Sequence, residues 1–146
     1  MAEIHPKLEV PLSTRILVVD DSEIMLTGMR TILSTLGFTD VVSARKGATA
    51  WNLILEQIEK QKPFEIILCD WNMPGYISGV QLLEKVRTAT THNSTIFILV
   101  TTENTFDKVK KAMDLGVSNY IIKPYAHTDV TLKLNSTWKK SKQAAA

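Results

Sequence analysis

The feature that most limits the fold of this 146-residue chain is a regular alternation of short apolar runs with longer segments of helical periodicity. The runs Arg15–Val19 and Phe64–Cys69 are apolar at nearly every position, which is typical of strands buried on both faces of a parallel sheet. Similar but weaker runs bring the expected strands to five, at residues 15–19, 40–44, 64–69, 95–100 and 118–122.

Between these strands, apolar residues recur at the spacing of a helix face. The first helix is expected to begin after Ser22, which can act as its N-cap, and to end at Gly37. Its predicted inward residues are Met25, Met29, Ile32, Leu33 and Leu36. Further helices are expected around 48–58, 80–88, 106–113 and 130–138. The predicted inward residues of the second helix include Ala48, Trp51, Ile54, Leu55 and Ile58. Those of the fourth helix include Phe106, Val109, Ala112 and Met113.

Strands that alternate with helices predict a single α/β domain with a five-stranded, doubly wound parallel sheet. We expect this domain to span residues 14–140. Residues 1–13 contain two prolines and no sustained periodicity, so they are interpreted as a flexible N-terminal extension. Residues 141–146 are interpreted as a C-terminal tail.

Composition excludes several classes of function. The formal net charge of +2 and the absence of a basic stripe argue against direct nucleic-acid binding. No apolar run approaches the roughly 20 residues of a membrane span, so no membrane insertion is expected. The single cysteine, Cys69, cannot form an internal disulfide and agrees with a reducing compartment. A cytoplasmic location is therefore expected.

Polar side chains stand where the expected strands end. Asp20 and Asp21 follow the first strand, and Asp70 follows the third; Thr101 and Lys123 follow the fourth and fifth. Because parallel strands end at one edge of a sheet, these groups should converge there, where doubly wound sheets bind their ligands. Three carboxylates repel one another unless a cation neutralises them. Mg²⁺ fits because it binds carboxylates together with phosphate oxygens and water, and Mn²⁺ can take its place.

Four sequence blocks around these residues resemble the signature blocks of response-regulator receiver domains, most closely the CheY-like, chemotaxis-type members. They are Val18-Val19-Asp20-Asp21, Asp70-Trp71-Asn72-Met73-Pro74, Val100-Thr101 and Lys123-Pro124-Tyr125. The resemblance implies a flavodoxin-like strand order of 2-1-3-4-5, which the strands alone do not establish. The segment 75–79 is one residue longer than the usual family stretch, which leaves the conformation of that loop open.

The resemblance also implies the chemistry of the site. Asp70 would accept a phosphoryl group from a sensor histidine kinase, with Lys123 and Thr101 contacting the transferred group. Asp20, Asp21, Asp70 and the backbone carbonyl of Asn72 would bind the magnesium ion. Such transfer depends on positioning and charge neutralisation, which this set of side chains can supply.

Further residues are implied in switching. Thr101 and Tyr120 would move on phosphorylation and reshape the surface formed by the helix at 106–113, the strand at 118–122 and the last helix. A downstream target protein would bind that face, with Lys108, Lys110, Lys111 and Tyr120 as contact residues. Asn72, Thr102 and Glu103 would modulate hydrolysis of the acyl phosphate.

The leading hypothesis is thus a phosphorylation-controlled signalling protein, not an enzyme, and the chemotaxis-type resemblance implies a role in chemotaxis. A phosphorelay intermediate that passes its phosphoryl group to a histidine phosphotransfer protein is an alternative. A third is a Mg²⁺-dependent phosphohydrolase with Asp70 as nucleophile, although Asn72 is an amide where such an enzyme needs an acid. An unphosphorylated scaffold is the least favoured reading.

Overall fold

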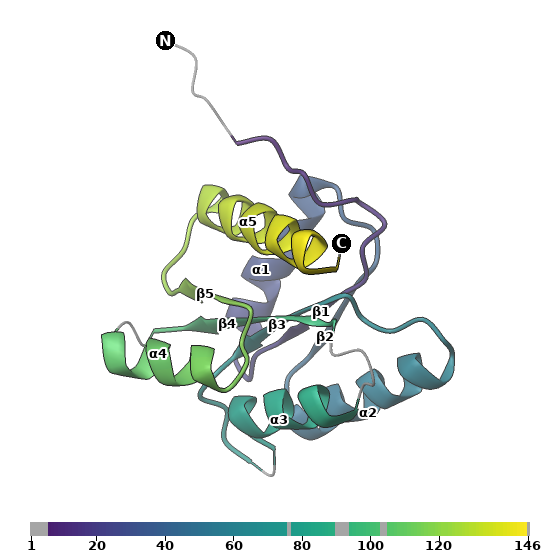
Figure 1. Cartoon of the computed structure of the whole chain (residues 1–146), viewed down its shortest axis with the longest axis vertical. Coiled ribbons are helices and arrows are strands. Elements are labelled where there is room, and N and C mark those ends of the chain that lie inside the picture. Colours follow the sequence, from purple (N-terminus) through teal and green to yellow (C-terminus); the bar gives the residue numbers. More distant parts are fainter. Residues whose placement is uncertain (1–5, 76, 90–93, 103–104, 146) are drawn as a thin grey trace.

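A computed structural model describes residues 6–75, 77–89, 94–102 and 105–145 of the chain. Five strands and five helices alternate along it (Figure 1). The strands are β1 (Ile16–Val19), β2 (Val41–Ala44), β3 (Ile66–Asp70), β4 (Ile96–Thr101) and β5 (Asn119–Ile122). The helices are α1 (Glu23–Leu36), α2 (Gly47–Glu59), α3 (Gly79–Ala89), α4 (Phe106–Asp114) and α5 (His127–Ala145).

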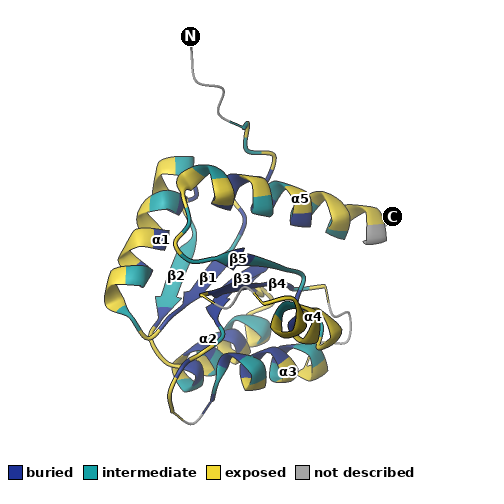
Figure 2. Ribbon diagram, turned by 90° about the vertical axis from the view of Figure 1, so that its left-hand side faces the viewer, coloured by how far each residue is buried: buried dark blue, intermediate teal, exposed yellow. Residues whose placement is uncertain are grey.

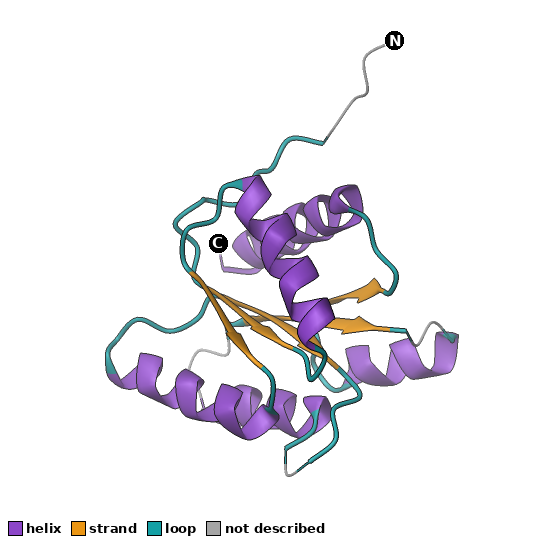
Figure 3. Cartoon of the chain, turned by 180° about the vertical axis from the view of Figure 1, so that it is seen from behind, coloured by secondary structure: helices purple, strands orange, loops and turns teal. Residues whose placement is uncertain are grey.

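The five strands form one parallel sheet in the order β2-β1-β3-β4-β5. The parallel sheet that the alternation of strands and helices predicts is therefore confirmed. The strand order that the resemblance implies is confirmed as well. Figure 3 shows the sheet edge-on between its helices. Within the described residues, no helix combines the length and the apolar composition that crossing a membrane requires.

Helices cover both faces of the sheet, so the domain has two apolar cores. Successive side chains of a strand point to opposite faces; hence Leu17 and Val19 belong to the core beneath α2, α3 and α4, whereas Ile16 and Val18 belong to the core beneath α1 and α5. Burial colouring shows the strands enclosed between these two layers (Figure 2). The loops that follow the strands remain available for a site at the sheet edge.

Helix α1 begins and ends where the sequence predicts. The hydroxyl of Ser22 accepts a hydrogen bond from Met25 N–H, and Gly37 ends the helix with a φ of 105°, a left-handed conformation that favours glycine. The predicted buried face is displaced by one residue at its start, because Leu26 is buried and Met25 is only half-buried. Leu26, Met29 and Leu33 are spaced at three and four residues and meet the sheet together.

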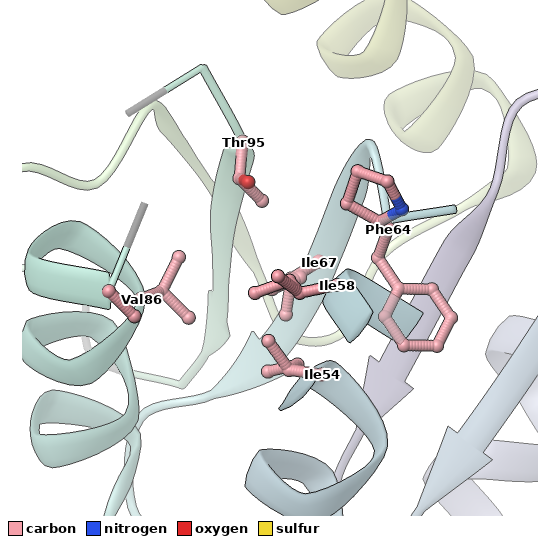
Figure 4. Close-up of a pocket in the computed structure, with 8 residues that line it drawn as sticks. Ile54, Ile58, Phe64, Ile67, Val86 and Thr95 are labelled. Atoms are coloured by element: carbon pink, nitrogen blue, oxygen red, sulfur yellow. The ribbon is translucent and has the colours of Figure 1, made fainter. Parts of the chain in front are cut away.

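The buried face of α2 also differs from the prediction. Ala50 and Ile54 are buried, whereas Leu55 is 43% exposed. Ile54 lines a small apolar cavity of about 10 Å³ between α2, α3 and β3, in which it faces Ile67 and Val86 (Figure 4). This volume is close to that of one water molecule, so the cavity is a packing gap and has no room for a ligand.

Truncation of these two neighbours in α2 should therefore have different effects. We expect Ile54→Ala to lower the free energy of unfolding by about 3 kcal/mol, because it enlarges an apolar cavity that the surrounding residues cannot fill. Leu55→Ala serves as the matched control and should cost less than about 1 kcal/mol, since its side chain remains in contact with solvent. Urea denaturation of both variants measures the difference, and equal losses would show that α2 presents a different face to the sheet.

Within the predicted N-terminal extension, Lys7 and Glu9 contact α5. The amide of Asn135 joins this segment to the helix, since its Oδ1 accepts from Glu9 N–H at 2.7 Å and its Nδ2 donates to Lys7 O at 2.8 Å. Val10 is buried in the core beneath α1 and α5. The prolines prevent regular secondary structure, but an extended segment still has backbone groups that one side-chain amide can pair.

Candidate functional site

The carboxyl ends of four strands position the residues of the candidate site. Asp20 comes directly after β1, Asp70 is the last residue of β3, Thr101 is the last residue of β4, and Lys123 comes directly after β5. The parallel register places Asp70 opposite Val100 and Thr101 opposite Ile122, so these ends are level with one another. The structure thus brings groups from distant parts of the sequence to one edge of the sheet.

Asp20, Asp21 and Asp70 form a compact acidic cluster. Each offers a carboxylate oxygen, and these three oxygens all lie within 4.8 Å of one another. Asp20 and Asp70 are buried, whereas Asp21 is exposed, so one side of the acidic cluster is open to solvent. Oxygen ligands from two or three carboxylates with an open side fit a magnesium ion, which retains water and phosphate oxygens in its coordination shell.

Lys123 partly neutralises the acidic cluster. Its Nζ lies 2.8 Å from Asp20 Oδ2 and 3.6 Å from Asp70 Oδ2. All three side chains are at most 12% exposed, so this charge is poorly screened by water. One ammonium cannot balance three carboxylates, which leaves a net negative charge for a divalent cation to offset.

Burial raises the pKa of Asp70 above its usual value of 3.8. The positive charge of Lys123 lowers the pKa of Asp70, whereas the negative charge of Asp20 raises it. A hydrogen bond from Asn72 N–H to Asp70 Oδ1 also lowers this pKa, and the charge of Asp21 raises it. Asp70 is therefore a carboxyl group that resists ionisation in the metal-free protein. Burial also raises the pKa of the neighbouring Cys69 thiol, in keeping with a packing role for that residue.

Local backbone contacts fix the loops that hold the two buried carboxylates. Ser22 N–H donates to Asp20 Oδ1 at 2.9 Å and orients that side chain at the start of α1. Gly79 lets the first turn of α3 pack against the backbone at the end of β3, since a Cβ at this position would lie 2.5 Å from Asp70 O. Residue 76, in the lengthened loop, lies outside the described residues.

Thr101 is connected to Lys123 through the backbone. Lys123 N–H donates to Thr101 O at 2.7 Å, and the Thr101 side chain is buried. Thr102 and Asn72 are exposed beside the site. Glu103, predicted to modulate hydrolysis, lies outside the described residues.

Tyr120 lies on β5 at the edge of the sheet and is half-buried. The Nζ of Lys133, in α5, lies 4.3 Å from the centre of the Tyr120 ring, within the range of a cation–π contact. Sequence reasoning missed Lys133 because the contact joins separate elements and belongs to no local motif. The periodic pattern of α5 indicates only that Leu134, beside it, is buried.

The predicted partner residues of α4 do not share one face. Lys108 and Lys111 line a groove beside Trp71 and Asn72, whereas Lys110 does not contribute to that lining. Two predicted inward residues of this helix are exposed, Phe106 by 77% and Met113 by 39%, and only Ala112 is buried. Helix α4 therefore rests on the sheet through a narrow contact and leaves both its flanks accessible.

The raised pKa of Asp70 predicts a pH dependence of stability in metal-free protein. Because the folded-state pKa exceeds the unfolded value, the added stability is fully present below the unfolded pKa and is lost as pH rises through the folded pKa. Asp70→Asn removes this titration, so the free energy of unfolding of the variant should rise relative to that of the wild type as the pH increases above the usual pKa of 3.8. Urea denaturation in EDTA checks this; parallel profiles would contradict it, and added Mg²⁺ should reduce the difference.

Comparison with known proteins agrees with this site. The model of the response regulator receiver domain family matches residues 16–135. A chemotaxis protein CheY homolog of Campylobacter jejuni is 38% identical over 111 residues, which cover 76% of this chain and 82% of that protein. The chemotaxis protein CheY1 of Helicobacter pylori is 37% identical over 111 residues, covering 76% and 86% of the two chains.

Solved structures show the same fold. A receiver domain protein from Clostridium thermocellum superposes with a TM-score of 0.75 at 23% identity, over 90% of this chain and 98% of that one. A CheY-like receiver domain protein from Methanospirillum hungatei gives 0.74 at 26% identity, with the same coverage. The family match spans most of the chain and includes all four strand ends of the site. The chain therefore belongs to the response regulator receiver domain family.

Proposed function

We propose that this chain is a phosphorylation-activated signalling switch, with residues 14–140 as its receiver domain and Asp70 as the phosphoryl acceptor. The observation that supports it most is the acidic cluster, in which three carboxylate oxygens lie within 4.8 Å of one another beside a lysine whose side chain is only 12% exposed. Receiver domains are signalling proteins rather than enzymes, and their family implies a histidine kinase as partner. A phosphohydrolase function is accordingly not proposed.

Asp70 is the group that would react. A carboxylate oxygen of Asp70 attacks the phosphorus of a phosphohistidine, the P–N bond breaks, and the imidazole nitrogen keeps the bonding electron pair. The product is an acyl phosphate on Asp70. Asp20, Asp21, Asp70 and the backbone carbonyl of Asn72 would hold Mg²⁺, which when bound supplies positive charge to the phosphoryl oxygens.

Lys123 and Thr101 would transmit the change. A phosphoryl group on Asp70 draws the Lys123 ammonium away from Asp20, because it presents more negative charge at close range. The Thr101 hydroxyl donates to a phosphoryl oxygen. The backbone hydrogen bond between these two residues supports a coupled movement of β4 and β5, whose ends it joins.

The movement would alter the surface formed by α4, β5 and α5. Tyr120 turns toward the space that Thr101 leaves, and the surface around Tyr120 and Lys110 then binds a downstream target protein. Asn72, Thr102 and Glu103 would set the lifetime of the acyl phosphate by their access to attacking water. The names of the relatives support a role in chemotaxis. A cytoplasmic location is part of the same proposal.

Phosphorylation itself is the direct test of this function. Incubation of the chain with acetyl phosphate and Mg²⁺ should add the mass of one phosphoryl group, and EDTA should prevent the addition. Amide NMR shifts should then change at β4, α4 and β5 and recover as the acyl phosphate hydrolyses. A chain that acquires no adduct would refute the proposal. Transfer from the phosphorylated chain to a histidine phosphotransfer protein would support the phosphorelay alternative instead.

A further inference from the structure

A groove of about 260 Å³ separates α3 from α4 beside the loop that follows Asp70. Figure 2 shows these two helices next to each other on the same face of the sheet. The described residues that line the groove are Trp71, Asn72, Val80, Lys108, Lys111 and Leu115. Its volume is below the roughly 300 Å³ at which pockets for small organic ligands begin, and it suits a few protein side chains.

The groove belongs to one flank of α4 only. Lys108, Lys111 and Leu115 are spaced at three and four residues, so they lie on one side of the helix. Phe106, Lys110 and Met113 have the same kind of spacing on the opposite side of α4. The proposed target-binding surface and this groove therefore use different flanks of α4.

The lining has a definite chemical character. Lys108 and Lys111 bring positive charge to a lining that also includes the apolar residues Trp71, Val80 and Leu115, and none of the described lining residues has a carboxylate. This combination complements a protein segment that presents acidic side chains around an apolar one. Such charges also speed association and orient the arriving partner.

Contacts outside the groove fix the position of α3. Arg87 of α3 donates from Nε to Gly116 O at 2.9 Å, which ties α3 to the residues after α4, and from Nη1 to Thr95 O at 2.6 Å, which ties α3 to the start of β4. At the first turn of α3, Gly79 packs against the backbone of Asp70 and Trp71. A preformed groove loses little conformational entropy when a partner binds.

The position of the groove selects the partner. Trp71 follows Asp70 directly, and Asn72 N–H is hydrogen-bonded to Asp70 Oδ1. A segment in this groove lies beside the acceptor carboxylate, where the protein that donates the phosphoryl group must be during transfer. We infer that the α3–α4 groove is a docking site for an acidic, apolar-centred segment of the phosphoryl-donor kinase. This inference depends on the proposed function, since it needs Asp70 to be the acceptor.

Charge reversal on the two flanks of α4 tests this inference. The donor is a purified, phosphorylated sensor histidine kinase that transfers to the wild-type chain. Lys111→Glu should raise the KM for transfer about tenfold with little change in kcat. Lys110→Glu makes the same charge change on the opposite flank and should raise that KM less than about twofold. Higher salt should raise the KM of the wild type more than that of Lys111→Glu.

Acetyl phosphate separates docking from chemistry. It needs no protein docking surface, so Lys111→Glu should be phosphorylated by it as fast as the wild type. Equal increases in the KM for transfer in Lys110→Glu and Lys111→Glu, or no increase in either variant, would overturn the inference. It would also be overturned if Lys111→Glu weakened only the binding of the target protein and left transfer from the kinase unchanged. Failure of acetyl phosphate to modify the wild type would instead refute the proposed function itself.

Discussion

Replacement of Asp70 by asparagine should abolish phosphoryl incorporation completely. The amide keeps the shape of the side chain but lacks the anionic oxygen that attacks phosphorus, and it removes one of the three ligands of the acidic cluster. We expect intact-mass analysis after incubation with acetyl phosphate and Mg²⁺ to give the phosphoryl adduct for the wild type and no adduct for Asp70→Asn. No other change in the chain should produce so large an effect on this measurement.

A matched control separates loss of the acceptor from a general loss of charge. Asp107 is an exposed aspartate in the first turn of α4, and Asp107→Asn should retain full incorporation. Unfolding curves should show that Asp70→Asn is folded, since removal of one buried carboxylate relieves repulsion within the acidic cluster. An adduct that persisted in Asp70→Asn would place the acceptor elsewhere and contradict the proposed mechanism.

Replacement of Lys123 by glutamine should produce the largest loss of stability of any single change in the site. Lys123 contacts both buried carboxylates, at 2.8 Å from Asp20 and 3.6 Å from Asp70. Removal of one partner from a buried ion pair leaves the other charge uncompensated. We therefore expect Lys123→Gln to lower the free energy of unfolding by about 3 kcal/mol near neutral pH in the absence of metal.

The exposed pair of Lys60 and Glu56 supplies the control. Their charged atoms are 2.9 Å apart, close to the Lys123–Asp20 distance, but both side chains are more than half exposed. Lys60→Gln should cost only about 0.4 kcal/mol, because water screens the pair. Adding Asp70→Asn to Lys123→Gln should restore part of the lost stability. Equal losses for the two lysine variants in guanidinium denaturation would contradict a specific role of burial.

Much of the fold was predictable because the same sequence pattern marks every strand. Each strand is an apolar run that stops at a polar residue, and Ser22 and Gly37 delimit α1 as predicted. Parallel strands end at one edge, so the neighbourhood of Asp20, Asp70 and Lys123 follows from connectivity alone. The strand order entered through the resemblance, since apolar runs of similar composition give no preference among neighbours.

Helix faces were less predictable because hydrophobicity does not measure how much of a helix the sheet can cover. Leu55 and Phe106 fit the apolar pattern of their helices and are nevertheless exposed. In α4 the contact with the sheet is narrow, so the three lysines divide between two flanks that the sequence alone presents as one basic segment.

The sequence by itself determined the elements, the chemical types at the strand ends and the family, because each is encoded by residues close together in the chain. Only the tertiary structure decided the charge balance of the acidic cluster, the contact of Lys133 with Tyr120 and the groove beside Trp71. These features depend on distances between side chains of separate elements. Such distances are set by packing of the whole domain, and no local pattern contains them.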